Sequence, residues 1–236
     1  KNGMQKALVE GVFDVHYQPI IDQETGQLSS MEALLRWPHP KEGMIPPEEF
    51  IPIAEATGLI LPLGEYVLRK VCNQIRSWED MGLEGFRVAV NISARQFEAD
   101  VSALVQDAMA TSGIKPSALT IEITEGLAMK NVEHYTTMLE DLRRLGVNIS
   151  MDDFGTGYSS LSQLHKIPFT ELKIDKSFVR NLQDDPDAYA IVKTCIKLGH
   201  ELGLSVVAEG VETKQHADTL VSLGCDLAQG YYFSRP

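Results

Sequence analysis

Short apolar runs alternate with segments of helical periodicity along most of the chain, and this alternation limits the fold more than any other feature. Runs typical of buried strands cover residues 87–91, 119–123, 147–152, 170–174 and 205–208. Apolar residues recur at helical spacing over residues 66–81, 101–111, 135–145, 188–202 and 215–223. Gly146, Gly203 and Gly224 separate helix from strand, as residues after a helix end often do. The pattern predicts a mainly parallel sheet, because helical crossovers join successive parallel strands.

The beginning of the chain departs from this pattern. Two expected strands, residues 13–19 and 28–35, are joined by the turn-rich segment IDQETGQ. So short a connection favours an antiparallel hairpin. The Pro-rich residues 37–50 are expected to form a loop leading into a helix that Pro46 and Pro47 begin. With 236 residues, we predict one α/β domain over residues 1–236: a modified TIM-type (β/α)8 barrel with an antiparallel first strand.

The wider context of the domain is predicted from its ends and its apolar runs. The chain begins at Lys1 and not at a methionine, which indicates a piece of a longer, multidomain protein. No apolar run is long enough to cross a bilayer, and no signal segment opens the chain. We therefore expect no membrane insertion of this segment and a cytoplasmic location, whether or not the parent protein is anchored in a membrane.

Polar residues end or interrupt the predicted strands, about one in each βα unit. They are Glu32, Asn91, Glu122, Asp152, Asp153, Lys173, Glu209 and Gln229. Because the C-terminal ends of barrel strands meet at one mouth, where such enzymes keep their active sites, these side chains are expected to converge. Asp152 and Asp153 would point to opposite faces of a regular strand. Both reach one site only where the strand ends and the chain turns, which Gly155 and Gly157 permit.

Five carboxylates in one place need positive charge. A single acid at a strand end is more often an ion-pair member or a helix cap, so a salt-bridge network is the alternative interpretation. Only Arg36 and Lys173 are basic residues that the sequence places nearby, and crowded carboxylates repel one another without a cation. The three scattered cysteines and six histidines contain no CxxC, HxxxH or HExxH pair, which argues against zinc. We predict a hard divalent cation held by oxygen.

Two other functions are disfavoured. The net charge of −12 opposes binding to a nucleic-acid polymer. FGTGYSS, residues 154–160, resembles the start of a dinucleotide-binding fingerprint, but Ser160 stands where the third glycine would be. The two aspartates before it would also repel a pyrophosphate.

Eight short motifs, in order and at βα spacing, resemble the EAL phosphodiesterase family over residues 8–236. They are YQPI (17–20), EALLRW (32–37), NIS (91–93), EITE (122–125), DDFGTGYSS (152–160), KIDKSFV (173–179), AEGVET (208–213) and QGYYFSRP (229–236). The resemblance implies metal-dependent hydrolysis of cyclic di-GMP to linear 5′-pGpG. One departure is Gly126 after EITE, where many relatives carry serine, and it bears on the positioning of the loop after Asp152.

The resemblance also implies roles for individual residues. Glu32, Lys173 and Glu209 would form the catalytic set. One Mg²⁺ or Mn²⁺ would be held by Glu32, Asn91, Glu122 and Asp152, and a second by Asp152, Asp153 and Glu209. Lys173 would hydrogen-bond the attacking water. The substrate site would be lined by Gln18, Leu34, Arg36 and Gln229, and the loop after Asp152 would be supported by Glu125 and Glu212. Ca²⁺, which is larger, is expected to bind and inhibit.

Alternatives to this activity remain open at the level of sequence. The first is a receptor domain that binds cyclic di-GMP without cleaving it, although no residue of the implied metal set is missing. The second is a barrel enzyme that stabilises an enolate, which needs dedicated Lys or His bases, and only Lys173 is present. The third is a purely structural barrel. The family resemblance further implies a homodimer in which residues 154–160 connect the site to the dimer contact.

Overall fold

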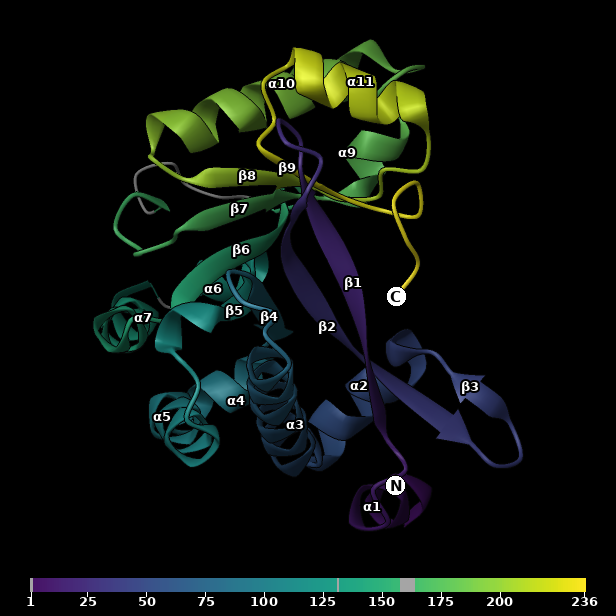
Figure 1. The fold of residues 1–236 in the computed structure, drawn as a ribbon, viewed down its shortest axis with the longest axis vertical. Coiled ribbons are helices and arrows are strands. Elements are labelled where there is room, and N and C mark those ends of the chain that lie inside the picture. Colours follow the sequence, from purple (N-terminus) through teal and green to yellow (C-terminus); the bar gives the residue numbers. More distant parts are fainter. Residues whose placement is uncertain (1, 131, 158–163) are drawn as a thin grey trace.

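A closed ring of strands forms the centre of the molecule (Figure 1). The computed structural model describes residues 2–130, 132–157 and 164–236. Within them, eight strands close the ring in the order β1-β9-β8-β7-β6-β5-β4-β2, and β2 pairs again with β1. They are β1 (Asp14–Asp22), β2 (Leu28–His39), β4 (Arg87–Asn91), β5 (Leu119–Thr124), β6 (Asn148–Phe154), β7 (Glu171–Ile174), β8 (Ser205–Ala208) and β9 (Leu227–Gln229). β1 is antiparallel to both neighbours and the other ring pairings are parallel, which confirms the predicted modified barrel.

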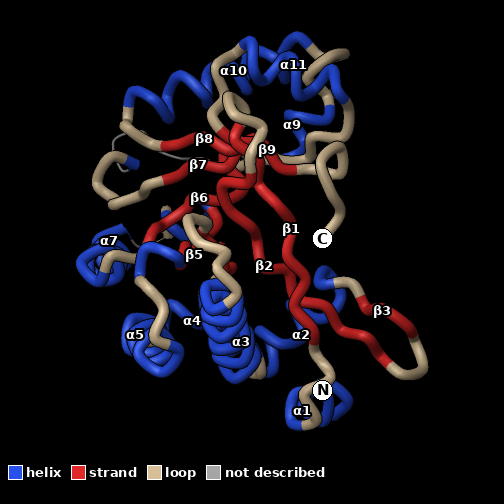
Figure 2. Tube along the Cα trace, in the orientation of Figure 1, coloured by secondary structure: helices blue, strands red, loops and turns tan. Residues whose placement is uncertain are grey.

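Helices surround the ring of strands (Figure 2). The long ones are α3 (Ile60–Asp80), α5 (Val101–Ser112), α7 (Val132–Leu145), α10 (Pro186–Glu201) and α11 (Lys214–Ser222). Each was predicted from its apolar periodicity. Short helices after strand ends were not predicted, because one or two turns are too few to show a period. They are α4 (Ala94–Glu98), α6 (Glu125–Ala128) and α9 (Lys176–Arg180), and the 3₁₀ turn Pro116–Ala118 before β5 was missed for the same reason.

Glycine permits the sharp turn from helix to strand at the predicted positions. Gly146, Gly203 and Gly224 have φ angles of 93°, 72° and 77°. This left-handed region is costly for residues with a Cβ atom. The turns direct each following strand back into the ring, so the C-terminal ends of the parallel strands meet at one end of the barrel.

A second, smaller core lies beside the barrel, where β1 begins and β2 ends. It joins α1 (Asn2–Val9), α2 (Pro47–Thr57) and β3 (Gly43–Ile45). Its buried members are Met4, Ala7, Phe13, Trp37, Phe50, Ala54, Ile60 and Leu63. α2 begins at Pro47, as predicted.

The predicted loop over residues 37–50 is wrong in part. β2 continues to His39, and β3 pairs with it antiparallel, with Trp37 opposite Ile45 and Pro38 opposite Met44. Burial of Trp37 explains the longer strand, because its ring packs against Phe13 and Phe50 with centroids 5.4 and 5.6 Å apart. A tertiary contact thus outweighs the local preference of a Pro-rich segment.

Within the described residues, none of the helices combines the length and the apolar character that a bilayer crossing requires. α3, with 21 residues, buries only one face.

Candidate active site

Lys173 is the centre of the polar cluster at the C-terminal end of the barrel. Its side chain is fully buried, and its Nζ atom lies 2.6–3.4 Å from a carboxylate oxygen of each of four residues. The four are Glu32, Glu122, Asp152 and Glu209. They come from β2, β5, β6 and the end of β8, so the fold brings together residues that are up to 177 positions apart. The predicted convergence of polar strand ends is present in the structure.

Glu32 is held in place by amide groups from both sides. Asn91 Nδ2 donates to Oε1 of Glu32 at 2.8 Å, and Gln229 Nε2 donates to Oε2 at 2.7 Å. Gln229 Nε2 also lies 3.1 Å from Gln18 Oε1, and Gln18 Nε2 donates to the backbone carbonyl of Ser234 at 3.2 Å. Four predicted residues therefore form one chain of hydrogen bonds across β1, β2, β4 and β9.

The two fully enclosed glutamates differ in their partners, and their pKa values move in opposite directions. Burial raises the pKa of Glu122 well above its usual range; Lys173 opposes this rise, and the neighbouring carboxylates of Glu32 and Asp152 add to it. Burial also opposes ionisation of Glu32, but Lys173 and the hydrogen bonds from Gln229 and Asn91 lower its pKa. Oε1 of Glu122 lies 3.1 Å from Lys173 Nζ, but Oε2 has no hydrogen-bond partner within the described residues. Glu122 therefore keeps one oxygen for another partner.

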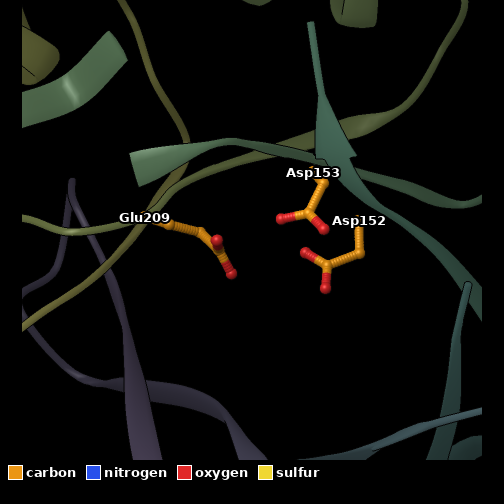
Figure 3. Close-up of side chains that lie close together, drawn as sticks. All are labelled: Asp152, Asp153 and Glu209. Carbon is orange, nitrogen blue, oxygen red and sulfur yellow. The ribbon is translucent and has the colours of Figure 1, made fainter. Parts of the chain in front are cut away.

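A triad of carboxylates lies beside Lys173 at the opening of the barrel. Asp152, Asp153 and Glu209 each offer an oxygen, and these atoms lie within 4.8 Å of one another. Figure 3 shows the two aspartates extending from the β6 segment toward Glu209. Burial, together with the charge of Asp152, raises the pKa of Asp153 to about 6. Burial also raises the pKa of Glu209 to about 8, against the opposing charge of Lys173 and with the support of neighbouring carboxylates. The repulsion that the sequence predicted is thus present.

Asp153 reaches the triad by a different route from the one predicted. The strand does not end before it, because β6 continues to Phe154. Instead, Asp153 has a φ of 56° and is the only non-glycine residue with positive φ in the part of the chain described. The pairing of β6 with β7 shifts register between Met151 and Phe154. This bulge turns the Asp153 side chain toward the same site as Asp152, and such backbone strain is common at functional sites.

The donor set fits a hard divalent cation. Four carboxylates contact one ammonium group, and Asp153 lies in the adjoining triad. With all five ionised, four negative charges remain, the number that two divalent cations would balance. Oε2 of Glu122 is buried without a hydrogen-bond partner in the described residues, whereas Oε1 of Glu122 and Oδ1 of Asp152 have the Lys173 ammonium at 3.1 and 3.4 Å. Buried polar atoms are normally satisfied, so Oε2 of Glu122 marks a position for an additional ligand. Oxygen donors of this kind suit cations such as Mg²⁺ and Mn²⁺.

Of the two residues predicted to support the loop after Asp152, one contacts it. The buried Glu125 accepts hydrogen bonds through Oε2 from the backbone nitrogen atoms of Gly155 and Gly157, at 2.8 and 3.2 Å. Glu212 instead pairs with Arg180 of α9, and within the described residues it forms no hydrogen bond or ion pair with residues 153–157. A Cβ atom added at Gly126 would meet nothing within 4 Å, so a serine would fit there. Residues 158–160, predicted to lead to a dimer contact, lie outside the described residues.

A cleft of about 570 Å³ opens above the acidic cluster. It is lined by all four residues predicted to bind substrate, namely Gln18, Leu34, Arg36 and Gln229. Sequence reasoning missed its apolar wall, formed by residues 44–47 of β3 and α2, and two further cations, Lys176 and Arg180 of α9. Lys176 stands only three residues after Lys173, so the KIDKSFV motif itself carried a signal for a second cation near the barrel opening.

Comparison with known proteins identifies relatives over the full chain. The family model described as the EAL domain matches residues 1–236. The bifunctional diguanylate cyclase/cyclic di-GMP phosphodiesterase MucR of Pseudomonas aeruginosa is 44% identical over 234 residues, which cover 99% of this chain and 34% of MucR. The cyclic di-GMP phosphodiesterase NbdA of the same organism is 42% identical over 234 residues, 99% of this chain and 30% of NbdA. The chain thus spans about a third of the length of these relatives.

A solved structure agrees with the fold. The PaMucR phosphodiesterase, determined as a c-di-GMP complex, superimposes with a TM-score of 0.97 at 44% identity, covering 100% of this chain and 96% of that one. The closed barrel with an antiparallel first strand and the eight motifs along the chain lead to the same assignment. The chain belongs to the EAL domain family.

Proposed function

We propose that this domain hydrolyses cyclic di-GMP to linear 5′-pGpG with the help of two divalent cations. The observation that carries the proposal is the convergence of Glu32, Glu122, Asp152 and Glu209 on one buried lysine, below a cleft lined by cations and amides. Hydrolysis of a phosphodiester needs an oriented water and compensation of charge on the phosphoryl oxygens. The site contains groups suited to both tasks.

The acidic side chains divide into two candidate cation sites that share Asp152. Asn91 uses its Nδ2 atom on Glu32 and keeps its oxygen for a cation, which Glu32, Glu122 and Asp152 would complete. Asp153 and Glu209 would hold the second cation together with Asp152. Bound there, such cations would lower the pKa of an attacking water and stabilise charge on the phosphate. Mg²⁺ and Mn²⁺ suit compact carboxylate sites, whereas Ca²⁺ is larger and prefers looser geometry.

Lys173 would act as a hydrogen-bond donor and charge-balancing group. Four carboxylates surround its Nζ atom, and they favour the ammonium form over the free amine. An ammonium group at this point can orient a water against the phosphate, but it cannot accept a proton from it. Glu32 and Glu209, which both contact Lys173, would keep the lysine in place and complete the catalytic set.

The cleft above would bind the substrate through groups from several strand ends. Arg36 offers a forked guanidinium suited to phosphate oxygens. Gln18 and Gln229 hydrogen-bond each other, and Gln229 Oε1 is buried without a donor, so it can accept from a ligand. Leu34 contributes apolar surface to the same cleft. Each is placed by a strand of the ring, which limits its motion relative to the acidic cluster.

The second candidate is a receptor domain that binds cyclic di-GMP and leaves it intact. The site argues for the enzyme, because all six implied metal-binding residues are present and five of them contact one another or Lys173. We further propose a cytoplasmic location, where a nucleotide second messenger acts, and a homodimer, as the family resemblance implied.

The deciding experiment is chromatography of the products after incubation of the domain with cyclic di-GMP and Mn²⁺. We expect linear 5′-pGpG, with no product in EDTA. In Ca²⁺ we expect binding by calorimetry but no turnover. Binding without turnover in both Mg²⁺ and Mn²⁺ would establish the receptor function instead. If Ca²⁺ activates as well as Mn²⁺, the compact two-cation site is the wrong description.

A further inference from the structure

Strand β2 separates the cleft from the second core, because alternate side chains of a strand point to opposite faces. Leu34 and Arg36 line the cleft. Leu35 and Trp37, which alternate with them along the strand, pack in the second core. Two side chains that the proposed function assigns to substrate binding therefore stand on a strand whose other face rests on the second core.

The apolar wall of the cleft, residues 44–47, is attached to the same core. Ile45 lines the cleft and also packs against the buried residues of the second core. It lies opposite Trp37 in the pairing of β3 with β2, and the ring of Trp37 packs on Phe50 of α2 with centroids 5.6 Å apart. Phe50 is fully buried and lies within one helical turn of Pro47, where the wall ends. The position of the wall therefore depends on how tightly the second core is packed.

The second core shares few side chains with the main core of the barrel. Among the described residues, the buried members of the two cores are separate sets, and Leu35 and Tyr66 are the hydrophobic residues that pack against both. The segment that carries the wall begins at Gly43 and ends before Gly58, and these glycines have left-handed φ angles of 76° and 77°. Residues at the ends of elements are where hinges form. The segment can therefore shift with the second core while the barrel keeps its shape.

Helix α1 supplies two buried members of the second core, Met4 and Ala7. It lies outside the ring of strands, at the end of the molecule where β1 begins (Figure 1). Its 8 residues are too few for a helix that is stable alone in water, so α1 keeps its shape through this contact. Loss of the Met4 side chain would leave a cavity, and the core around it would pack less tightly.

We propose that α1, through Met4 and the second core, positions the apolar wall of the cleft and the β2 side chains beside it. Met4 and Ala7 are then positioning residues for substrate binding, although neither lines the cleft. The inference rests on the proposed function, since it assumes that a substrate is held in the cleft. The acidic cluster belongs to strands of the ring, so the packing of α1 should affect substrate affinity and leave turnover nearly unchanged.

The first test is Met4→Ala, and its matched control is Met109→Ala. The two methionines are 3% and 6% exposed, but Met109 belongs to the main core, on α5. Both substitutions leave a cavity and should lower Tm by about 5 to 10 °C. Kinetics with cyclic di-GMP and Mn²⁺, measured well below Tm, should separate them. We expect KM to rise about tenfold in Met4→Ala with kcat changed by less than about twofold, and neither to change in Met109→Ala.

A purely structural role of α1 would give a different result. Equal changes of KM in the two variants, or a lower Tm in Met4→Ala with an unchanged KM, would overturn the inference. Met4→Leu keeps the volume of the side chain and should keep the wild-type KM. A raised KM in Met4→Leu would contradict packing as the cause.

A milder pair of variants serves if Met4→Ala does not fold. Glycine weakens a helix without leaving a large cavity. Ala7→Gly in α1 should raise KM by about threefold, whereas Ala108→Gly, at a buried position of α5, should not change it. The same KM in both variants would overturn the inference.

Hydrogen exchange measures the coupling without any substrate. Backbone amides of β3 and α2 should exchange about tenfold faster in Met4→Ala than in the wild type, and those of β4, β5 and β6 should not. Unchanged exchange in β3 and α2 would overturn the inference even in an active enzyme. A wild-type domain that neither binds nor cleaves cyclic di-GMP would overturn the proposed function instead. Faster exchange in β3 and α2 would then still support the coupling of α1 to the wall.

Discussion

Two groups of buried charges lie inside the same barrel and differ in their balance. At the C-terminal end, Lys173 faces four carboxylates. Toward the other end, Arg87 at the start of β4 pairs with Glu171 at the start of β7, with Nη2 and Oε2 3.4 Å apart. Glu171 and Lys173 are two residues apart on β7, so both point into the barrel.

The comparison separates a structural ion pair from a site that needs further cations. The Arg87–Glu171 pair is one charge against one, and Glu171 is almost completely buried with its charge matched. The cluster around Lys173 has more carboxylates than cations and leaves Oε2 of Glu122 without a hydrogen-bond partner in the described residues. The number of counter-charges, more than the presence of buried acids, therefore indicates where metal chemistry takes place. Four predictions test this difference, from the largest expected effect to the smallest.

Removal of the Glu32 carboxylate should have the largest effect. Glu32→Ala is expected to lower kcat by roughly 10³-fold or more, because Glu32 contacts Lys173 and is one of the proposed metal ligands. The fold should persist, as circular dichroism would show, since little core volume is removed. A folded Glu32→Ala variant with full activity in Mn²⁺ would refute the metal assignment.

Replacement of the central lysine should reduce turnover more than binding. Lys173→Met is expected to lower kcat by roughly 10² to 10³, the effect of a typical electrostatic donor, with little change in cyclic di-GMP affinity in Ca²⁺. The paired measurements are turnover in Mn²⁺ and calorimetry in Ca²⁺. Loss of both would make Lys173 a phosphate ligand. If neither changes, Lys173 is only a structural counter-ion, as Arg87 is for Glu171.

Metal binding at the acidic cluster around Lys173, where carboxylates outnumber cations, should stabilise the folded protein. Mn²⁺ at about 100 times its Kd is expected to raise Tm by about 5 to 10 °C relative to EDTA, because it binds the folded state. Thermal unfolding followed by circular dichroism measures the shift. Arg87→Met should retain it and Glu32→Ala should lose most of it. An equal shift in all three proteins would place the cation outside the barrel opening.

Disruption of the Arg87–Glu171 ion pair should lower the stability of the fold and leave catalysis almost unchanged. Arg87→Met leaves Glu171 buried without its partner and is expected to lower the free energy of unfolding by about 2 kcal/mol. Urea denaturation measures this loss, and kcat should change by less than about threefold. The double variant Arg87→Met with Glu171→Gln should recover part of the stability, since no unpaired charge remains. A large loss of kcat in Arg87→Met would show that the two groups act together.

The sequence alone was sufficient for the order of the helices between ring strands, for most ring strands and for most of the acidic cluster. Buried parallel strands are almost entirely apolar, so a polar residue near each strand end stands out. Spacing by βα units then predicts that these residues meet at one end of the barrel. The structure shows Glu32, Glu122, Asp152 and Glu209 meeting there around Lys173.

Only the tertiary structure decided features that depend on contacts between distant segments. The left-handed backbone of Asp153 follows from a register shift between β6 and β7, and no local pattern encodes such a pairing. Trp37 extends β2 because it packs on Phe13 and Phe50. Glu212 pairs with Arg180 because Gly210 lets the segment after β8 approach α9 closely. Sequence periodicity reports which face of an element is buried, but the partner on that face is selected by packing across the whole chain.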